Sequence, residues 1–244
     1  MSRQRWITTG LLGTVLALAA TGCSGTLEQG TGADGKGAAT GPPASSAAPG
    51  GAGGAPNGVK ALPGIPAPAQ ARTELAGLKV APAGSMSGYS RAKFPHWASQ
   101  GENCDTRETV LDRDGSGVER DGQCKAVTGT WVSRYDGVTV TKASGMDIDH
   151  TVPLANAWRS GAAAWTTEQR KAFANDLTHP QLVAVTAKTN RTKGDQSPDQ
   201  WAPPSKGYWC AYAESWTSVK STYKLTVTQA EKDKLTEMLG TCTG

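Results

Sequence analysis

The sequence predicts an α+β fold with a small central unit of two strands and a helix around a metal ion, accompanied by additional helices. A β-hairpin is predicted at 125–143, where residues rich in Val, Thr, Trp and Tyr are interrupted by Asp-Gly. The strand tendency continues to "MDIDH" (146–150), and after a helical insert a short apolar strand, "QLVAV" (181–185), leads into a helix that Gly194 ends. Small ββα units around a metal are built in this order.

Helical patterns surround this unit. A short helix or turn is expected at 89–99, and a helix at 105–114 has Asp105 or Thr106 as its predicted N-cap. The other predicted helices lie at 152–165, 166–176, 186–195, 210–223 and 228–242. No internal repeat is visible, so the folded part is expected to be one modest domain.

The N-terminus has the pattern of an export signal. Residues 1–22 begin with the basic "MSRQRW" and continue with an apolar run too short to span a bilayer comfortably. The run ends in "ATGC", which resembles a bacterial lipoprotein signal, so Cys23 is predicted to be lipidated. We therefore expect an exported protein on the outer face of the cell membrane, with plain secretion and a retained anchor as alternatives.

Composition divides the rest of the chain into a tether and a domain. Residues 23–72 are mostly Gly, Ala, Pro, Ser and Thr, which cannot bury a core and predict disorder. The predicted domain, 73–244, holds 20 Lys and Arg against 19 Asp and Glu, a net charge of +1. That balance excludes a polybasic coat, so any contact with nucleic acid must come from a local cluster. Membrane contact is expected only through the lipid, and no protein partner is evident.

The cysteines predict two disulfides. Four remain when Cys23 is set aside, an even number that favours disulfides in an exported domain and allows three pairings. Local loop closure favours Cys104–Cys124 and Cys210–Cys242. A four-thiolate zinc site is the rival, but no C-x-x-C pair is present. The stretch 112–123 partly follows a calcium loop, yet Gln123 stands where a bidentate Glu is needed, so a disulfide-closed turn is predicted there.

The central unit carries residues suited to hydrolysing a phosphodiester. That reaction needs an activated water, a partner for the charge of the phosphate and help for the leaving oxygen. A neutral His150 can take the proton from water. The carboxylate of Asp149 and the amide oxygen of Asn190 are hard ligands that suit Mg²⁺ or Mn²⁺. Arg191 and Lys193 can hold the phosphate electrostatically.

Taken together, "DIDHTVPL…QLVAV…TNRTKGD" resembles the HNH (His-Me finger, ββα-metal) endonucleases. The resemblance is stronger to the branch related to the C-terminal domain of GmrSD-type restriction endonucleases, and it covers roughly 87–242. It implies a general base at His150 and metal ligation by Asp149 and Asn190. It also implies that Asp147 matches an acidic position before this pair, and that Lys193 matches a basic position that contacts phosphate.

One departure from the family pattern leaves a role open. The middle asparagine of the HNH name, which orients the histidine, falls by spacing on Gln181, whose side chain is one methylene longer. Asn175, in "AFAND", is the alternative occupant. The remaining histidines, His96 and His179, have no comparable neighbours and are expected to be structural or surface residues.

The sequence therefore predicts an exported metal-dependent endonuclease acting on DNA, with RNA as a second possible substrate. The alternative is a non-catalytic, surface-tethered module of the same fold that binds a wall polymer or nucleic acid. A third possibility is a metal-dependent hydrolase of another phosphodiester, such as a wall glycopolymer.

Overall fold

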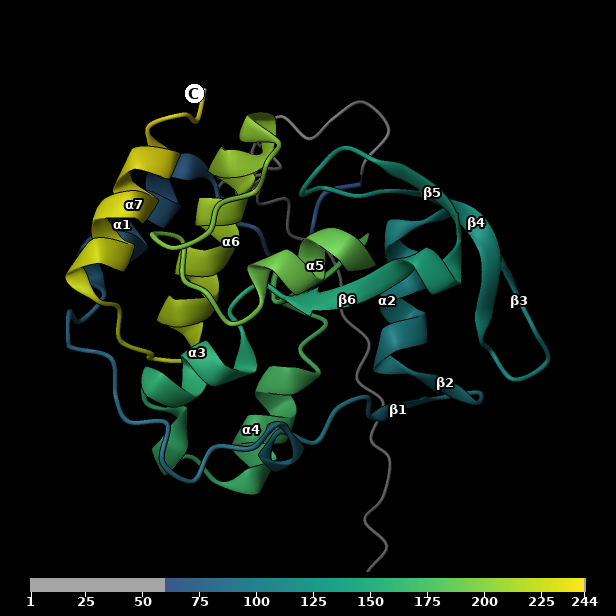
Figure 1. Cartoon of the computed structure of the whole chain (residues 1–244), viewed down its shortest axis with the longest axis horizontal. Coiled ribbons are helices and arrows are strands. Elements are labelled where there is room, and N and C mark those ends of the chain that lie inside the picture. Colours follow the sequence, from purple (N-terminus) through teal and green to yellow (C-terminus); the bar gives the residue numbers. More distant parts are fainter. Residues whose placement is uncertain (1–59, 244) are drawn as a thin grey trace, which may run out of the picture. The chain divides into compact units, whose positions relative to one another are not determined.

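The structure, a computed structural model, describes residues 60–243. The predicted signal peptide, Cys23 and most of the predicted tether lie outside the described residues. The fold is mixed α+β, with helices and small antiparallel sheets (Figure 1). Within residues 60–243, no helix combines the length and the apolar character that crossing a membrane requires.

The predicted central strands pair directly with each other. Strand β6 (Met146–His150) runs antiparallel to β7 (Leu182–Thr186), in an unbroken register that places His150 opposite Leu182. Helix α5 (Ala187–Lys193) follows β7 at once and packs against both strands. It ends at Gly194, whose φ of +57° favours glycine.

The predicted hairpin is confirmed, and it gains a third strand. Strand β4 (Ala126–Val132) lies between β5 (Thr139–Lys142) and β3 (Ser116–Arg120), and both pairings are antiparallel. Gly137 of the Asp-Gly pair adopts φ +73° in the β4–β5 connection. The predicted disulfide-closed turn at 112–123 was wrong for its centre, where the mostly polar residues of β3 are held as a strand by pairing with β4.

Side-chain caps start several of the helices, and one of them is the predicted Asp105. Helix α2 (Thr106–Asp114) begins after Asp105, whose carboxylate accepts the backbone N–H of Glu108, and α4 (Thr167–Ala174) begins with a capping box at Thr166. The other helices are α3 (Leu154–Arg159), α6 (Trp209–Thr222) and α7 (Gln229–Leu239). A small hairpin of β1 (Ser99–Gly101) and β2 (Cys104–Asp105) precedes α2.

The folded part begins earlier than the predicted boundary at residue 73. Helix α1 (Pro68–Gly77) begins inside the predicted tether and packs on α6 and α7 (Figure 1). Its Ala71 and Leu75 are buried, and so is Leu62 before it. Proline at the first turn suits a helix start, and the residues that follow are good helix formers. Composition alone did not predict this helix, because its buried face consists of small residues and one leucine.

Two hydrophobic clusters meet at the β6–β7 pair. In β7, Val183 and Val185 belong to the larger cluster around α6, whereas Leu182 and Ala184 belong to the smaller one around α2 and β4. Both faces of β7 are therefore covered, which explains why it reads as a continuous apolar run. In β6, Met146 and Ile148 join the smaller cluster, and the strand's alternation places Asp147 and Asp149 on the opposite face.

The two predicted disulfides are confirmed. Cys104–Cys124 joins β2 to the connection between β3 and β4, and Cys210–Cys242 ties the start of α6 to the segment after α7. Replacing Cys210 and Cys242 together by serine is expected to lower the free energy of unfolding by about 3–4 kcal/mol, because their bond closes a long loop. Urea unfolding measures this change. A loss below about 1 kcal/mol would show that the bond adds little.

Glu214 of α6 is buried without a full set of partners. Its side chain is 1% exposed, Oε1 lies 3.9 Å from Cys242 Sγ, and Oε2 has no hydrogen-bond partner among residues 60–243. Burial raises the pKa of Glu214 from 4.5 to about 7, against the opposing charge of Arg72. The folded state therefore holds this proton more tightly than the unfolded chain does.

Replacing Glu214 by glutamine is expected to stabilise the protein at pH 8 but not at pH 4. As the pH rises from 4.5 through about 7, the unfolded wild type loses this proton more readily than the folded state, so the free energy of unfolding falls. Neutral glutamine has no such proton to lose. Melting temperatures at the two pH values measure the effect, with a gain of several degrees expected at pH 8. Glu237→Gln, at an exposed position of α7, serves as the control. An equal gain at both pH values would contradict the explanation.

Candidate active site

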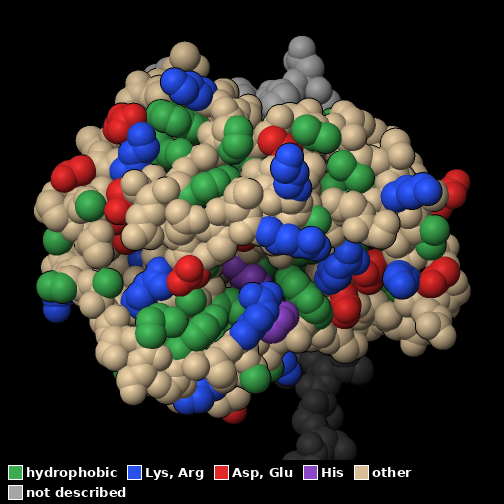
Figure 2. Space-filling view, viewed as in Figure 1, with side chains coloured by type: hydrophobic (Ala, Val, Ile, Leu, Met, Phe, Trp, Pro, Cys, Tyr) green, Lys and Arg blue, Asp and Glu red, His purple; other side chains and the backbone are tan. Residues whose placement is uncertain are grey.

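One pocket brings together four of the predicted site residues from distant parts of the chain. Its volume is about 410 Å³, and its walls include Asp149 and His150 of β6 together with Asn190 and Arg191 of α5. Arg91, from the segment before α2, lines it as well. Figure 2 shows histidine side chains within a hollow of the surface, with Lys and Arg side chains around it.

His150 is held with one ring nitrogen available. The side chain is 3% exposed, and Nε2 lies 2.9 Å from the carbonyl oxygen of Ala174. A carbonyl only accepts, so Nε2 carries the hydrogen and Nδ1 keeps a lone pair. Burial lowers the pKa of His150 to about 3, Arg91 and His96 add to this effect, and the bond to Ala174 opposes it. The imidazole is therefore neutral at neutral pH.

The segment before α2 covers the imidazole. The Trp97 ring stacks on His150 with centroids 5.6 Å apart and an interplanar angle of 16°, and the His96 ring lies 6.2 Å away. His96, which was expected to be a structural or surface residue, is thus a neighbour of His150. The sequence could not show this, because the two residues lie on separate elements.

Asn175 anchors this covering segment rather than the imidazole. Its Oδ1 accepts the backbone N–H of Ala98, and its Nδ2 donates to the carbonyl oxygen of Pro95, both at 2.8 Å. It follows directly after Ala174, whose carbonyl oxygen holds His150. Asn175 therefore fastens the covering segment beside the backbone group that orients the ring.

Gln181 is the other candidate for orienting the histidine, and it binds the turn that follows His150. The side chain is fully buried, accepting the N–H of Val152 at 3.1 Å and donating to its carbonyl oxygen at 3.0 Å. Its backbone oxygen accepts the N–H of Thr151 at 2.7 Å. Among the described residues, neither Gln181 nor Asn175 forms a hydrogen bond with the His150 ring; a backbone carbonyl does so instead.

Lys193 lies in the interior, which differs from the expected phosphate contact. Its ammonium is fully buried and donates to Asp149 Oδ2 at 2.6 Å and to the carbonyl oxygen of His150 at 2.9 Å. Tyr135 donates to the same carboxylate oxygen at 2.5 Å. Burial raises the pKa of Asp149 and lowers that of Lys193, while the charge of each partner opposes the other's shift. Lys193 thus holds Asp149 and the end of β6 in place.

Two side-chain oxygens at the pocket remain without a protein partner among the described residues. Asp149 uses Oδ2 for both of its hydrogen bonds, which leaves Oδ1. Asn190 donates from Nδ2 to Asp147 Oδ2 at 3.2 Å, which leaves its amide oxygen. A carboxylate and an amide oxygen in one pocket fit a hard divalent cation such as Mg²⁺ or Mn²⁺. Asp147, two residues before Asp149, orients the Asn190 amide.

Two arginines offer positive charge to the pocket. Arg191 has a side chain that is 78% exposed, with Nε 4.0 Å from Asp147 Oδ2. Arg91 lines the pocket and donates from Nε to His96 Nε2 at 3.3 Å. The other guanidinium nitrogens of Arg91 have no acceptor within residues 60–243. They can meet an anion beside His150.

Sequence reasoning missed three parts of this arrangement. Arg91 and Tyr135 lie outside the central unit in "YSRAKF" and "SRYDG", and no spacing connects either residue to the site. The carbonyl group of Ala174 carries no sequence signal, because every residue has one. Only the folded chain brings these groups to Asp149 and His150.

The comparisons with known proteins agree with the motif. The family described as "GmrSD restriction endonucleases, C-terminal domain" matches residues 106–238. A protein of Arthroderma benhamiae named "Uncharacterized secreted protein" is 57% identical over 187 residues, which span 77% of this chain and 92% of that protein. No solved structure matches significantly. The chain belongs to the family of the GmrSD restriction endonuclease C-terminal domain.

Proposed function

We propose that the protein is an exported, metal-dependent endonuclease that hydrolyses phosphodiester bonds of DNA. The observation that carries the proposal is that His150, with Nδ1 available, shares one pocket with the unpartnered oxygens of Asp149 and Asn190. Membership of a restriction endonuclease domain family supports nuclease chemistry over other uses of such a pocket. RNA is a second possible substrate.

In this mechanism His150 acts as the general base. Nδ1 removes the proton from the attacking water, and Nε2 keeps its hydrogen bond to Ala174, which steadies the ring as charge develops. The phosphate of the substrate opposes the positive field of Arg91, which raises the proton affinity of the imidazole in the complex.

The other residues bind and orient. Asp149 and Asn190 would hold Mg²⁺ or Mn²⁺, which supplies charge stabilisation for the phosphate and the leaving oxygen when bound. Arg91 and Arg191 contact non-bridging phosphate oxygens from the rim of the pocket. Lys193 sets the direction of the Asp149 carboxylate from inside.

Export is part of the same proposal. The signal-like N-terminus and the name of the Arthroderma protein both support it. Lipidation of Cys23 would place the enzyme at the outer face of the cell membrane, and cleavage without lipidation would release it.

Incubation of the full chain with supercoiled plasmid tests the activity. We expect nicked and linear products with Mg²⁺ or Mn²⁺ and none with EDTA, because the carboxylate and amide oxygens are the proposed ligands. Bis(p-nitrophenyl) phosphate hydrolysis under the same conditions reports the chemical step alone. A protein that shifts DNA in a gel yet cleaves neither substrate with either metal would instead be the non-catalytic binding module.

A further inference from the structure

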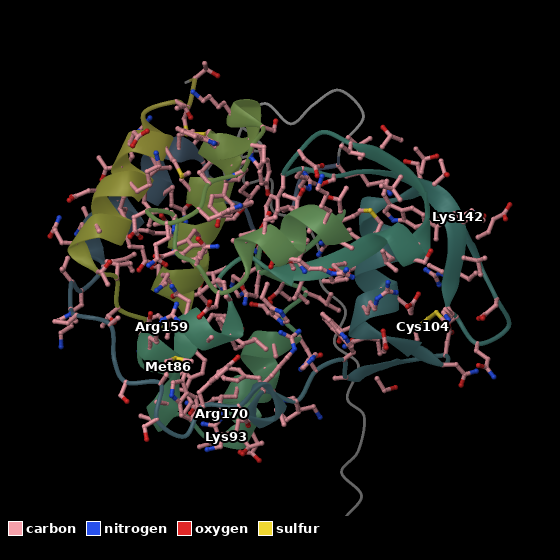
Figure 3. All side chains as sticks on the ribbon, in the orientation of Figure 1. Met86, Lys93, Cys104, Lys142, Arg159 and Arg170 are labelled. Carbon is pink, nitrogen blue, oxygen red and sulfur yellow. A yellow bond between two sulfur atoms is a disulfide. The ribbon has the colours of Figure 1, made fainter. Side chains whose placement is uncertain are left out.

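A second pocket lies next to the proposed active site. It has a volume of about 430 Å³ and is lined by residues from α3, the segment after α5 and the start of α7. Asp195 lines both pockets, and its carboxylate pairs at 2.5 Å with Arg159. Figure 3 labels Arg159, which lies at the end of α3. The Arg159–Asp195 ion pair therefore lies where the two pockets meet.

The second pocket offers directed hydrogen-bonding groups. Asn156 is 4% exposed, and its Oδ1 accepts from Lys220 at 2.7 Å, whereas its Nδ2 has no acceptor among the described residues. Gln200 uses Oε1 to accept from Ser197, which leaves its amide N–H groups. Asp199 accepts from Ser197 through Oδ1, which leaves Oδ2. Two amide donors and a carboxylate acceptor thus line one depression.

The charges of this pocket do not suit a phosphate. Its two neighbouring cations already have carboxylate partners, because Arg159 pairs with Asp195 and Lys220 pairs with Glu231 at 3.0 Å. Asp199 adds a further negative charge. A neutral group that both accepts from amides and donates to a carboxylate fits better. The nucleobases have such edges, since each carries N–H donors beside ring-nitrogen or carbonyl acceptors.

We propose that this second pocket binds the nucleobase of the nucleotide attached to the scissile phosphate. The inference rests on the proposed nuclease function and deepens it. With a phosphate bound between Arg91 and His150, the attached sugar would lie beside the Arg159–Asp195 ion pair, and the base would enter the second pocket. Asn156 and Gln200 would donate to acceptors of the base, and Asp199 would accept from one of its N–H groups.

Chromogenic esters with a single phosphodiester test the inference, because they fix the register of binding. Deoxycytidine, thymidine and abasic deoxyribose, each carrying p-nitrophenyl phosphate at either the 5′ or the 3′ position, are compared by kcat/KM. In one of the two series we expect the deoxycytidine and thymidine esters both to exceed the abasic one by about tenfold, equivalent to about 1.4 kcal/mol. Equal values for all three in both series would overturn the inference.

Variants tie this preference to the pocket. Asp199→Ala/Gln200→Ala is expected to bring the deoxycytidine ester within twofold of the abasic one and to leave bis(p-nitrophenyl) phosphate hydrolysis unchanged. The control is Gln229→Ala/Asp233→Ala, which removes an exposed amide and carboxylate pair of α7 outside the pocket lining and should keep the preference. A preference that survives in the pocket variant would contradict the assignment.

A binding measurement separates this inference from the nuclease proposal. In NMR spectra, the side-chain amide signals of Asn156 and Gln200 are expected to shift on addition of deoxycytidine 5′-monophosphate but not of deoxyribose 5-phosphate. If they shift although the protein cleaves no phosphodiester, only the nuclease proposal fails. If they stay in place although the protein cleaves DNA, the base-binding inference fails.

Discussion

Replacing His150 by alanine is expected to lower the initial rate of metal-dependent plasmid cleavage by about 10²- to 10⁴-fold, the usual contribution of a positioned general base. The change removes the Nδ1 lone pair at the pocket and leaves Asp149 and Asn190 in place. Gel densitometry over time, with saturating Mg²⁺ or Mn²⁺, measures the loss.

His179→Ala is the matched control for this experiment. That imidazole pairs with Asp176 at 2.7 Å and does not line the pocket, so cleavage by the variant should stay within about twofold of the wild type. Circular dichroism should show that both variants are folded. If folded His150→Ala protein cleaves plasmid at the wild-type rate, another group activates the water.

Replacing Lys193 by methionine is expected to destabilise the protein by about 3–5 kcal/mol, because Asp149 would be left as a buried carboxylate without its ammonium partner. The melting temperature should fall by on the order of 10 °C. The additional change Asp149→Leu should recover part of this stability, since it removes the orphaned charge, but it should not restore cleavage.

A control variant and a contrary result test the interior role of Lys193. Lys188→Met, on the exposed side of the same helix α5, should change the melting temperature little. If Lys193 were a phosphate contact, methionine there would leave stability unchanged and would raise KM and weaken the salt dependence of DNA binding instead. That result would contradict the interior role of Lys193.

Elements with strong local signals were predictable from the sequence. The hairpin around Gly137, the helix capped by Asp105 and the helix ended by Gly194 all depend on groups a few residues apart. Local loop closure likewise identified both disulfides. Helix α1 was missed because it is stabilised mainly by distant partners, α6 and α7. Strand β3 was missed because its polar sequence carries no strand pattern and is held by pairing with the neighbouring β4.

In the candidate site, too, the sequence predicted some residues, whereas the roles of others depended on the folded structure. Spacing and residue type pointed to Asp149, His150 and Asn190, and the structure brings these three to one pocket. It also separates the roles of residues that the motif had grouped together, since Lys193 faces the interior and Gln181 binds the Val152 backbone. Burial decides these roles, and a side chain's burial depends on what the rest of the chain packs against it.

By itself, the sequence determined the chemistry that this protein can offer: a histidine, oxygen ligands and basic residues in a recognisable order, within a cystine-containing α+β domain. Only the tertiary structure decided which nitrogen of His150 is available, which lysine is buried, and that Arg91 and a second polar pocket adjoin the site. The physical reason is that residue types and their spacing can be recognised along the sequence. Hydrogen-bond direction and solvent access instead arise from contacts between segments far apart in the chain.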